Sequence, residues 1–192
     1  MLPILKEYRQ LYPGVRIRVS NHSTPQAIDA LKNGLVDIAV VTTPLDLSDS
    51  MKSITIKSIQ EVAICGSAFS FLAENPLTLS ELAEYPLICL GESTKTYEFY
   101  STFFKDNGVA FLPSVEAATA DQIMPLVMHD LGIGFVPVDF WEKAKDSGSV
   151  HILHLGETIP PRNICLIKRK RTSLSIATKK LEELILDAKA VK

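Results

Sequence analysis

Hydroxyl-bearing side chains recur where a strand pattern gives way to a helix pattern. Thr24 opens one helix pattern, Thr42 follows the apolar strand VDIAVV, and Ser93, Thr94 and Thr119 precede two further helices. In open α/β sheets ligands bind beyond the carboxyl ends of the strands, and helix N-termini offer free N–H groups and a positive dipole end. Hydroxyls placed there suit a carboxylate-bearing ligand. Each of them alone is more simply an ordinary helix N-cap, so a binding site requires that several converge.

Cysteine and histidine give no sign of metal or cofactor chemistry. Cys65, Cys89 and Cys165 each lie inside an apolar run, without a CxxC pair, which is typical of small buried side chains. A redox role stays open if Cys65 and Cys165 lie on neighbouring strands. The four histidines are scattered, and no acidic cluster has ligand spacing. We therefore expect no metal ion and no cofactor.

The usual motifs of phosphate, hydrolase and zinc sites do not occur in the sequence. There is no GxGxxG, GxxxxGK[ST], GxSxG or HExxH, and the GIG of residues 132–134 lies inside a strand pattern. The one basic block is KRKR at residues 168–171. A helix carrying Glu182 and Glu183 follows it, so we interpret the block as a solvated turn. No catalytic group can be assigned.

Composition excludes further classes of protein. The chain has 192 residues and a formal net charge of -2, whereas a chain that binds nucleic acid by itself usually has a pI above about 9. Its apolar runs are far shorter than the roughly 18 residues of a membrane span. Residues 1–10 include Lys6, Glu7 and Arg9 and do not resemble a secretory signal. We expect a cytoplasmic protein.

Strand and helix patterns alternate along the whole chain, which indicates an α/β fold. Expected strands cover residues 15–20, 36–41, 61–65, 86–90, 114–117, 131–137, 150–155 and 163–168. Expected helices cover a segment after Met1 with Leu5, Tyr8 and Leu11 at helical spacing, residues 25–33, 78–85, about 95–107, 119–130, a segment around Trp141, and 174–188. Residues 15–41 thus form a strand–helix–strand crossover, and the near-continuous apolar run VDIAVV is typical of a parallel strand covered by helices on both faces.

Helix boundaries follow from capping residues. We expect Thr24 as an N-cap, with Gly34 ending that helix. Thr78 with Glu81, and Thr119 with Gln122, form two capping boxes. Pro125 predicts a bend in the helix that follows Thr119. The aromatic side chains at helical spacing after residue 95 are most simply core; they are Tyr97, Tyr100, Phe103 and Phe104.

The N-terminal helix pattern lacks a preceding strand. In an alternating α/β chain a helix normally follows a strand that delivers it to the sheet. We therefore expect the chain to be a fragment whose natural start lies upstream.

The order of these segments resembles the effector-binding domain of LysR-type transcriptional regulators. LPILKEYRQLYPGVRIRV is similar to the family's opening "LP…F…YP" helix, and AIDALKNGLVDIAVV is similar to its "L…L…G.lDlai" signature. LTLSELAEYPLICL resembles the linker and strand "l.dLa..plIl", and LVMHDLGIGFVP resembles "lV..g.Gi.llP". Together the four segments extend over nearly the whole chain in the family's order.

The resemblance implies a periplasmic-binding-protein-like type 2 fold, in which two α/β subdomains joined by two crossover strands enclose a small-molecule cleft. Subdomain I would comprise residues 1–65 and 163–192, and subdomain II residues 66–162, with crossovers near residues 65–67 and 161–165. The family's winged helix-turn-helix, linker helix and first strand would be missing. The family also implies a homodimer or homotetramer that contacts operator DNA through the missing part, and no membrane.

Carried over by position, the resemblance implies a set of effector-binding residues at strand ends and helix starts. They are Thr24, Thr42, Gly91, Glu92, Ser93, Thr94, Thr119, Pro137 and Val138. Three positions depart from the family. Thr42 stands where some relatives have arginine, Glu92 brings a negative charge, and Asp130 replaces a customary glycine at a turn. A strongly anionic effector is therefore less expected.

Two other functions remain open from the sequence. A solute-binding protein of a transporter shares this fold, and it would carry an export signal where a regulator carries a helix-turn-helix. Enzymes also use the fold, although fold alone does not specify function. The sequence favours the effector-sensing domain of a regulator that is not an enzyme.

Overall fold

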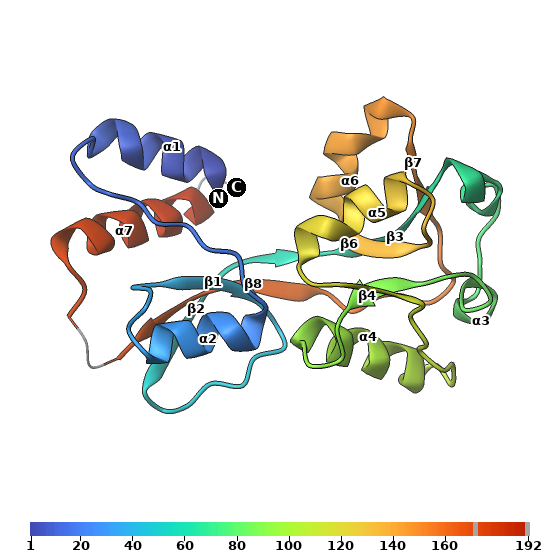
Figure 1. Ribbon diagram of the computed structural model, residues 1–192, viewed down its shortest axis with the longest axis horizontal. Coiled ribbons are helices and arrows are strands. Elements are labelled where there is room, and N and C mark those ends of the chain that lie inside the picture. Colours follow the sequence, from blue (N-terminus) through green and yellow to red (C-terminus); the bar gives the residue numbers. More distant parts are fainter. Residues whose placement is uncertain (171–172, 191–192) are drawn as a thin grey trace. The chain divides into compact units, whose positions relative to one another are not determined.

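The computed structural model describes residues 1–170 and 173–190, and it divides into two compact units (Figure 1). Unit 1 comprises Met1–Ser58 and Asn163–Lys192, and unit 2 comprises Ile59–Arg162. The chain passes from one unit to the other at residues 58–59 and 162–163. The first passage therefore precedes residues 65–67, where the resemblance had located a crossover. The assignment of residues 1–65 and 163–192 to one regulatory subdomain, and of 66–162 to the other, stays a prediction.

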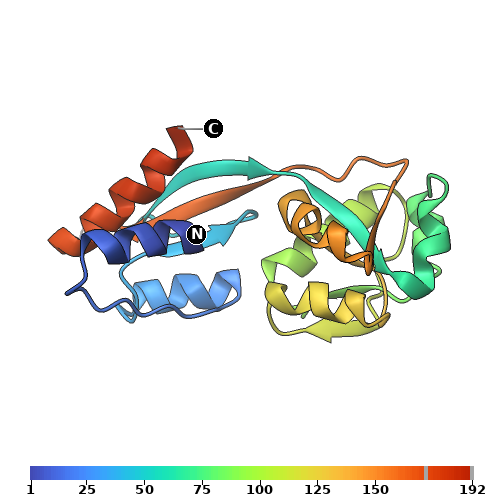
Figure 2. The same ribbon diagram turned by 90° about the horizontal axis from the view of Figure 1, so that it is seen from above.

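Unit 1 is a three-stranded sheet with helices on both faces. Its elements are α1 (Leu2–Leu11), α2 (Thr24–Lys32), β1 (Ala39–Thr42), β2 (Met51–Ile59), β8 (Arg162–Arg169) and α7 (Ile176–Ala190). The strand order is β1-β8-β2, and β1 runs antiparallel to β8 with Thr42 opposite Ile164. Figure 2 shows β2 and β8 side by side. Helix α2 lies on one side of this sheet, and α1 and α7 lie on the other (Figure 1).

The core of unit 1 explains why these elements form. Leu31 of α2 packs with Val41 of β1, Met51 of β2 and Ile167 of β8, and all four are buried. On the other side, the buried Tyr8 of α1 donates a hydrogen bond from its hydroxyl to the carbonyl oxygen of Ala177 at 2.9 Å. The apolar cluster thus fixes α2 to the sheet, and the hydrogen bond ties α1 to α7.

Two strand predictions for unit 1 are wrong, and one strand was not predicted. Residues 15–20 lie in extended coil and join no strand of the described chain, so the parallel crossover of residues 15–41 does not form. Strand β1 begins at Ala39 rather than residue 36, and its partner β8 is antiparallel. Strand β2 was not predicted at all.

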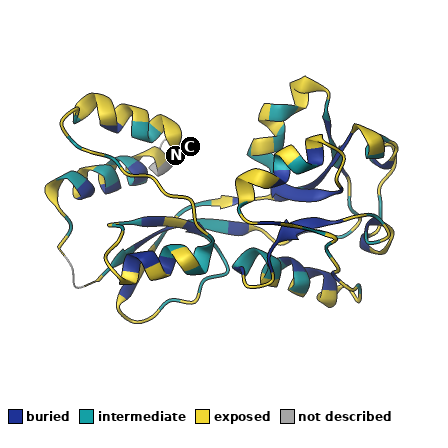
Figure 3. Ribbon diagram, in the orientation of Figure 1, coloured by how far each residue is buried: buried dark blue, intermediate teal, exposed yellow. Residues whose placement is uncertain are grey.

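Unit 2 contains the remaining helices and strands. They are β3 (Glu61–Gly66), η1 (Ser67–Ala73), α3 (Leu79–Leu82), β4 (Ile88–Leu90), α4 (Lys95–Asp106), β5 (Val115–Ala117), η2 (Ala120–Gln122), α5 (Ile123–Met128), β6 (Gly134–Pro137), α6 (Val138–Ala144), η3 (Lys145–Ser147) and β7 (Val150–Leu153). Helices α5 and α6 lie on one side of the strands, and α4 lies on the other (Figure 1). The strands are mostly buried between these helices (Figure 3).

Strands β4, β5 and β6 of unit 2 run in the same direction. β4 pairs in parallel with β5, and a parallel bridge joins Leu87 to Ile133 directly before β6. β3 runs antiparallel to β6, with Glu61 opposite Pro137. The carboxyl ends of β4, β5 and β6 and the start of β3 therefore lie at one edge, which we call the carboxyl edge.

The aromatic stripe of α4 is core, as predicted. Tyr100, Phe103 and Phe104 are buried. The Phe135 ring of β6 stacks on Tyr100 with ring centroids 4.5 Å apart, and Phe111 lies 4.7 Å from Phe104. Helix α4 is thereby anchored to the sheet, and its N-terminus lies at the carboxyl edge.

Both predicted capping boxes are confirmed, and the helix after Thr119 is shorter than expected. Thr78 caps α3 and Thr119 caps η2, each with its reciprocal side chain three residues later. Residues 119–130 do not form one bent helix. They form the 3-10 turn η2 and then α5, which ends at Met128 and contains Pro125 in its first turn.

Asp130 has a structural role at the turn where the resemblance implies a glycine. Its φ of 60° is left-handed, which is unusual for a residue with a side chain. Its carboxylate accepts a hydrogen bond from the backbone N–H of Ala68 at 2.9 Å, at the start of η1. A Cβ at Gly66 would collide with this carboxylate and with the carbonyl of Val127. Asp130 therefore ties the turn after α5 to the end of β3.

Among the described residues no helix is both long and apolar enough to cross a membrane.

Candidate functional site

The carboxyl edge of unit 2 gathers seven of the nine predicted site residues. They follow β4 (Gly91, Glu92, Ser93, Thr94), follow β5 (Thr119), and end β6 and begin α6 (Pro137, Val138). Because β4, β5 and β6 run in the same direction, their ends lie at the same edge of the strands. This is where α/β sheets bind ligands.

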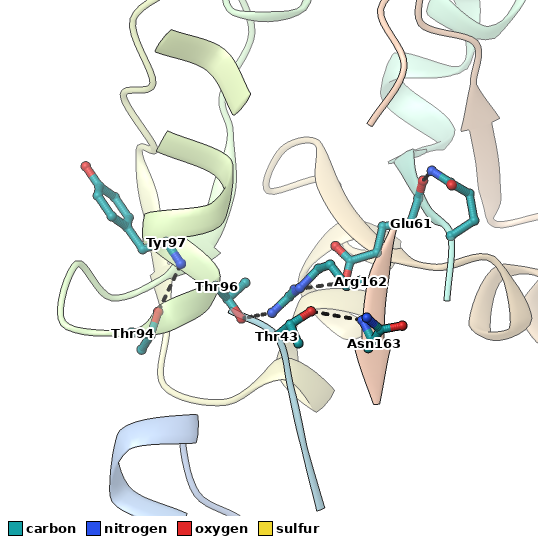
Figure 4. A network of polar contacts seen from close by, with 8 residues as sticks. Thr43, Glu61, Thr94, Thr96, Tyr97, Arg162 and Asn163 are labelled. Carbon is teal, nitrogen blue, oxygen red and sulfur yellow. Dashed lines mark hydrogen bonds and ion pairs between the residues drawn. The ribbon is translucent and has the colours of Figure 1, made fainter. Parts of the chain in front are cut away.

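The turn between β4 and α4 combines a glycine with a helix N-cap. A Cβ at Gly91 would collide with Oε1 of Glu116, so a larger residue would displace this exposed carboxylate where the turn passes β5. Thr94 is buried, and its hydroxyl accepts a hydrogen bond from the backbone N–H of Tyr97 at 3.1 Å (Figure 4). Glu92 and Ser93 are exposed. The turn thus presents two exposed side chains in front of a helix N-terminus, whose dipole favours negative charge.

Glu92 sets the charge of this turn. Burial raises the pKa of the Tyr97 hydroxyl, and the neighbouring charge of Glu92 raises it further. Tyr97 therefore stays a neutral donor or acceptor at ordinary pH. A ligand here meets a helix N-terminus that favours an anion and one carboxylate that opposes it.

The buried ion pair of Glu61 and Arg162 lies at the same edge and was not predicted. Arg162 donates from Nη1 to Glu61 Oε1 at 2.9 Å and from Nη2 to the hydroxyl of Thr96 at 3.2 Å (Figure 4). The side chains are 3% and 5% exposed, so water screens this pair little. The guanidinium also lies over the Phe99 ring, 4.8 Å from its centroid. Arg162 thereby joins the start of β3 to the first two turns of α4.

Burial is the largest influence on the pKa of Glu61. It raises the pKa of this carboxyl, and the charge and hydrogen bond of Arg162 act in the opposite direction. Glu61 Oε2 has no hydrogen-bond partner among the described residues, although it is buried. The next residue, Gln60, donates its side-chain amide to the carbonyl oxygen of Ile159 at 2.8 Å.

The sequence contains a signal for this pair that we did not use. Glu61 and Arg162 each stand directly before an apolar strand, in EVAIC and in RNICLI. A charged residue at the start of a buried strand usually needs a partner of opposite charge. Pairing the two would still require the fold, because they are 101 positions apart in the chain.

The other edge residues are in part structural. Thr119 is half-buried and caps η2, and Gln122 accepts hydrogen bonds from the backbone of Ala118 and Thr119. Pro137 and Val138 are half-buried, and the backbone N–H of Val138 donates to the carbonyl oxygen of Gln60 at 2.9 Å.

The two candidates in unit 1 lie at the start of α2 and at the end of β1. Thr24 is the first residue of α2 and not its N-cap, which corrects the prediction; Ser23 caps the helix in a capping box with Gln26. The S-x-x-Q spacing was visible in the sequence and was overlooked. Thr42 ends β1. The next residue, Thr43, accepts a hydrogen bond on its hydroxyl from the backbone N–H of Asn163 at 2.9 Å (Figure 4).

The cysteines are buried free thiols. Burial raises the pKa of Cys65 to about 11, helped by the charge of Asp130, and burial raises that of Cys89 to about 12. Cys65 lies on β3 between β6 and β7, whereas Cys165 lies on β8 between β1 and β2. They are not on neighbouring strands, which removes the basis for a redox pair. Across the described residues no group of three or more histidine, cysteine, aspartate or glutamate side chains could hold a metal ion.

Comparison with known proteins identifies the family of the chain. The family model described as "LysR substrate binding domain" matches residues 1–190. The HTH-type transcriptional regulator CysB of Haemophilus influenzae is 30% identical over 144 residues, which is 71% of this chain and 42% of the relative. SsuR of Burkholderia cenocepacia is 23% identical over 77% of this chain and 48% of its own length. The chain therefore spans about half the length, or less, of these regulators.

Solved structures show the same fold. The effector-binding domain of QuiR in complex with shikimate has a TM-score of 0.82 at 16% identity, and the match covers 99% of this chain and 90% of that one. The regulatory domain of CcmR from Synechocystis PCC6803 in complex with 2-PG has a TM-score of 0.82 at 17% identity, with coverage of 98% and 90%. The fold is the periplasmic-binding-protein-like type 2 fold, as predicted. The chain belongs to the LysR substrate-binding domain family.

Proposed function

We propose that this chain is the effector-sensing domain of a LysR-type transcriptional regulator, and that a small metabolite binds at the carboxyl edge of unit 2. The proposed contacts are Gly91, Glu92, Ser93, Thr94, Thr119, Pro137 and Val138. Thr24 and Thr42 of unit 1 stay predicted effector-binding residues. The observation that carries the proposal is the turn at residues 91–94, where β4 ends and α4 begins, in a chain that matches the family over residues 1–190.

The chemistry of the edge favours a small polar ligand with an acceptor group. Ser93 offers an exposed hydroxyl, and the first turn of α4 offers backbone N–H groups at the positive end of a helix dipole. Arg162 already holds Glu61 and Thr96, so its charge is largely satisfied within the protein. A monocarboxylate or hydroxylated carboxylate therefore fits better than a polyanion, because Glu92 stands at the same turn.

The relatives support the regulatory part of the proposal. Those named above are transcriptional regulators, and the two structural neighbours were solved with shikimate and with 2-PG bound. We infer for the whole protein a homodimer or homotetramer in the cytoplasm that contacts operator DNA through a part outside this chain. A ligand shifts such a switch only by its differential affinity for the two states, typically about 1 to 3 kcal/mol. Neither a transporter component nor an enzyme is indicated by these relatives.

A thermal-shift screen followed by calorimetry tests the binding function. Shikimate, 2-PG and a panel of small carboxylates would be added to the purified chain, and a ligand at 100 times its Kd should add about 2.7 kcal/mol of stability. Ser93→Ala should lower the affinity for the ligand identified in the screen by about tenfold. Ser80→Ala, an exposed serine on α3, should leave the affinity unchanged. Equal affinity in all three proteins would refute binding at the β4–α4 turn.

A further inference from the structure

We propose that unit 1 carries a second binding site, for a phosphate-class anion, in a hollow between the end of β8 and helix α7. The hollow has a volume of about 290 Å³. The polar residues that line it are Lys168, Arg169, Lys170, Ser173, Lys179 and Glu182. All lie in unit 1 and none belongs to the carboxyl edge, so this proposal does not depend on the proposed function.

The basic block of the sequence lies beside a further lysine of helix α7, which the sequence pattern did not predict. We interpreted residues 168–171 as a solvated turn; Lys168, Arg169 and Lys170 instead line the hollow, and Arg171 lies outside the described residues. Helix α7 brings Lys179 to the same hollow. Four cationic side chains therefore surround one small space, against the single carboxylate of Glu182.

The contacts within the hollow divide its cations into two kinds. Lys168 is paired with the buried Glu182, and Arg169 donates to the carbonyl oxygens of Leu31 and Val36. Lys170 and Lys179 are exposed, and no carboxylate of the described residues lies within ion-pair distance of either. Two anchored cations thus shape the site, and two lysines remain to meet a ligand.

A compact dianion fits this arrangement better than other ligands. A phosphate group carries a charge between about -1.5 and -2 at pH 7 and offers three acceptor oxygens, which suits two lysine ammonium groups and the Ser173 hydroxyl. The volume lies at the lower limit of small-molecule pockets, about 300 Å³, so it suits one phosphorylated group rather than a large ligand. DNA backbone is contacted along a row of phosphates by several cations, and the Glu182 carboxylate in the hollow disfavours such a surface. We assign the hollow to the phosphate of a small metabolite.

Calorimetric titration of the purified chain with inorganic pyrophosphate tests the proposal. Wild type should bind one equivalent with a sub-millimolar Kd. The double variant Lys170→Ala/Lys179→Ala should weaken binding at least tenfold, and Lys170→Arg/Lys179→Arg should retain it. The control Lys105→Ala/Lys143→Ala removes two exposed lysines of unit 2 and should bind as wild type does. Because all four lysines are exposed, an unchanged melting temperature should show that the variants fold.

The other outcomes overturn the proposal. Equal losses in both alanine pairs would show that pyrophosphate responds to net charge alone. Binding of a mixed-sequence DNA duplex through Lys170 and Lys179, without pyrophosphate binding, would assign the hollow to nucleic acid. A failure to find an effector for the carboxyl edge would leave all of these readouts unaffected.

Discussion

Removing Arg162 should destabilise unit 2 more than any other single change at the carboxyl edge. Arg162→Ala deletes the counter-charge of Glu61 and leaves a carboxylate that is 5% exposed and has one oxygen already without a partner. It also removes the hydrogen bond to Thr96 and the contact with the Phe99 ring. The damage is therefore an uncompensated buried charge and not merely a lost contact.

The expected loss follows from the burial of the pair. Removing one partner of a buried ion pair costs about 3–5 kcal/mol, whereas exposed pairs are worth about 0–1 kcal/mol. Domains of this kind have a free energy of unfolding of about 5–15 kcal/mol, so the variant should remain folded in water with a much lower stability. With an m value of about 1.5 kcal/mol/M, a loss of about 3 kcal/mol lowers the urea midpoint by about 2 M.

Tryptophan fluorescence allows the unfolding of unit 2 to be measured separately from that of unit 1. Trp141 is the one tryptophan of the sequence, and it lies on α6 beside the core of unit 2. Its emission during urea unfolding would therefore report on unit 2. Lys143→Ala, an exposed change on the same helix, serves as the control and should shift the midpoint little.

Two results would refute this reasoning. The first is a loss below about 1 kcal/mol in Arg162→Ala, which would mean that the pair is solvated. The second concerns the double variant Glu61→Gln/Arg162→Met. Replacing both partners removes the buried charge, so it should recover most of the stability that Arg162→Ala loses. No recovery would show that the contacts with Thr96 and Phe99 matter more than the charge.

Three further predictions concern unit 2. Thr94→Ala removes the N-cap of α4 and should cost about 1 kcal/mol in urea unfolding, whereas Thr94→Ser should cost little. Gly134→Ala places a methyl group 2.7 Å from Cγ2 of Ile123 and should cost about 1–3 kcal/mol; a neutral effect would show that α5 moves freely. The pKa values of about 11 for Cys65 and about 12 for Cys89 keep both thiols protonated in the folded chain, whereas thiols of the unfolded chain ionise near pH 8.5. The stability they contribute is complete below about pH 8.5 and is lost as the pH rises through 11 to 12, so the urea midpoint should fall more over this range in wild type than in Cys65→Ala/Cys89→Ala.

Local signals in the sequence predicted unit 2 well. Capping boxes such as Thr78 with Glu81 are complete within four residues, so no distant partner is needed to read them. The aromatic stripe of α4 likewise depends only on helical spacing. Ser93 and Thr94 were predicted as site residues because strand ends and helix starts are local features, whereas Gly91 and Glu92 were carried over from the resemblance; their contact with an effector stays a proposal.

Strands that depend on distant partners were predicted poorly. Residues 15–20 alternate as a strand does, yet Val19 is 70% exposed and the segment joins no sheet in the described chain. Strand β2 is the opposite case: it forms but was not predicted. Its lysines and serines obscure any period of two, and its burial does not alternate cleanly. Pairing in a sheet is set by which backbones meet, and side-chain patterns report that only indirectly.

The ion pair of Glu61 and Arg162 shows what such non-local pairing does for the proposed sensor. Glu61 stands near the start of unit 2 and Arg162 at its end, so the pair joins the two segments through which unit 2 continues into the rest of the chain. Arg162 also holds Thr96, two residues after the Thr94 cap at the turn proposed to bind the effector. A ligand that moves the first turn of α4 therefore acts on a buried contact shared with both linking segments. Because that contact is costly to break, a shift of α4 should be transmitted to these segments rather than absorbed within unit 2.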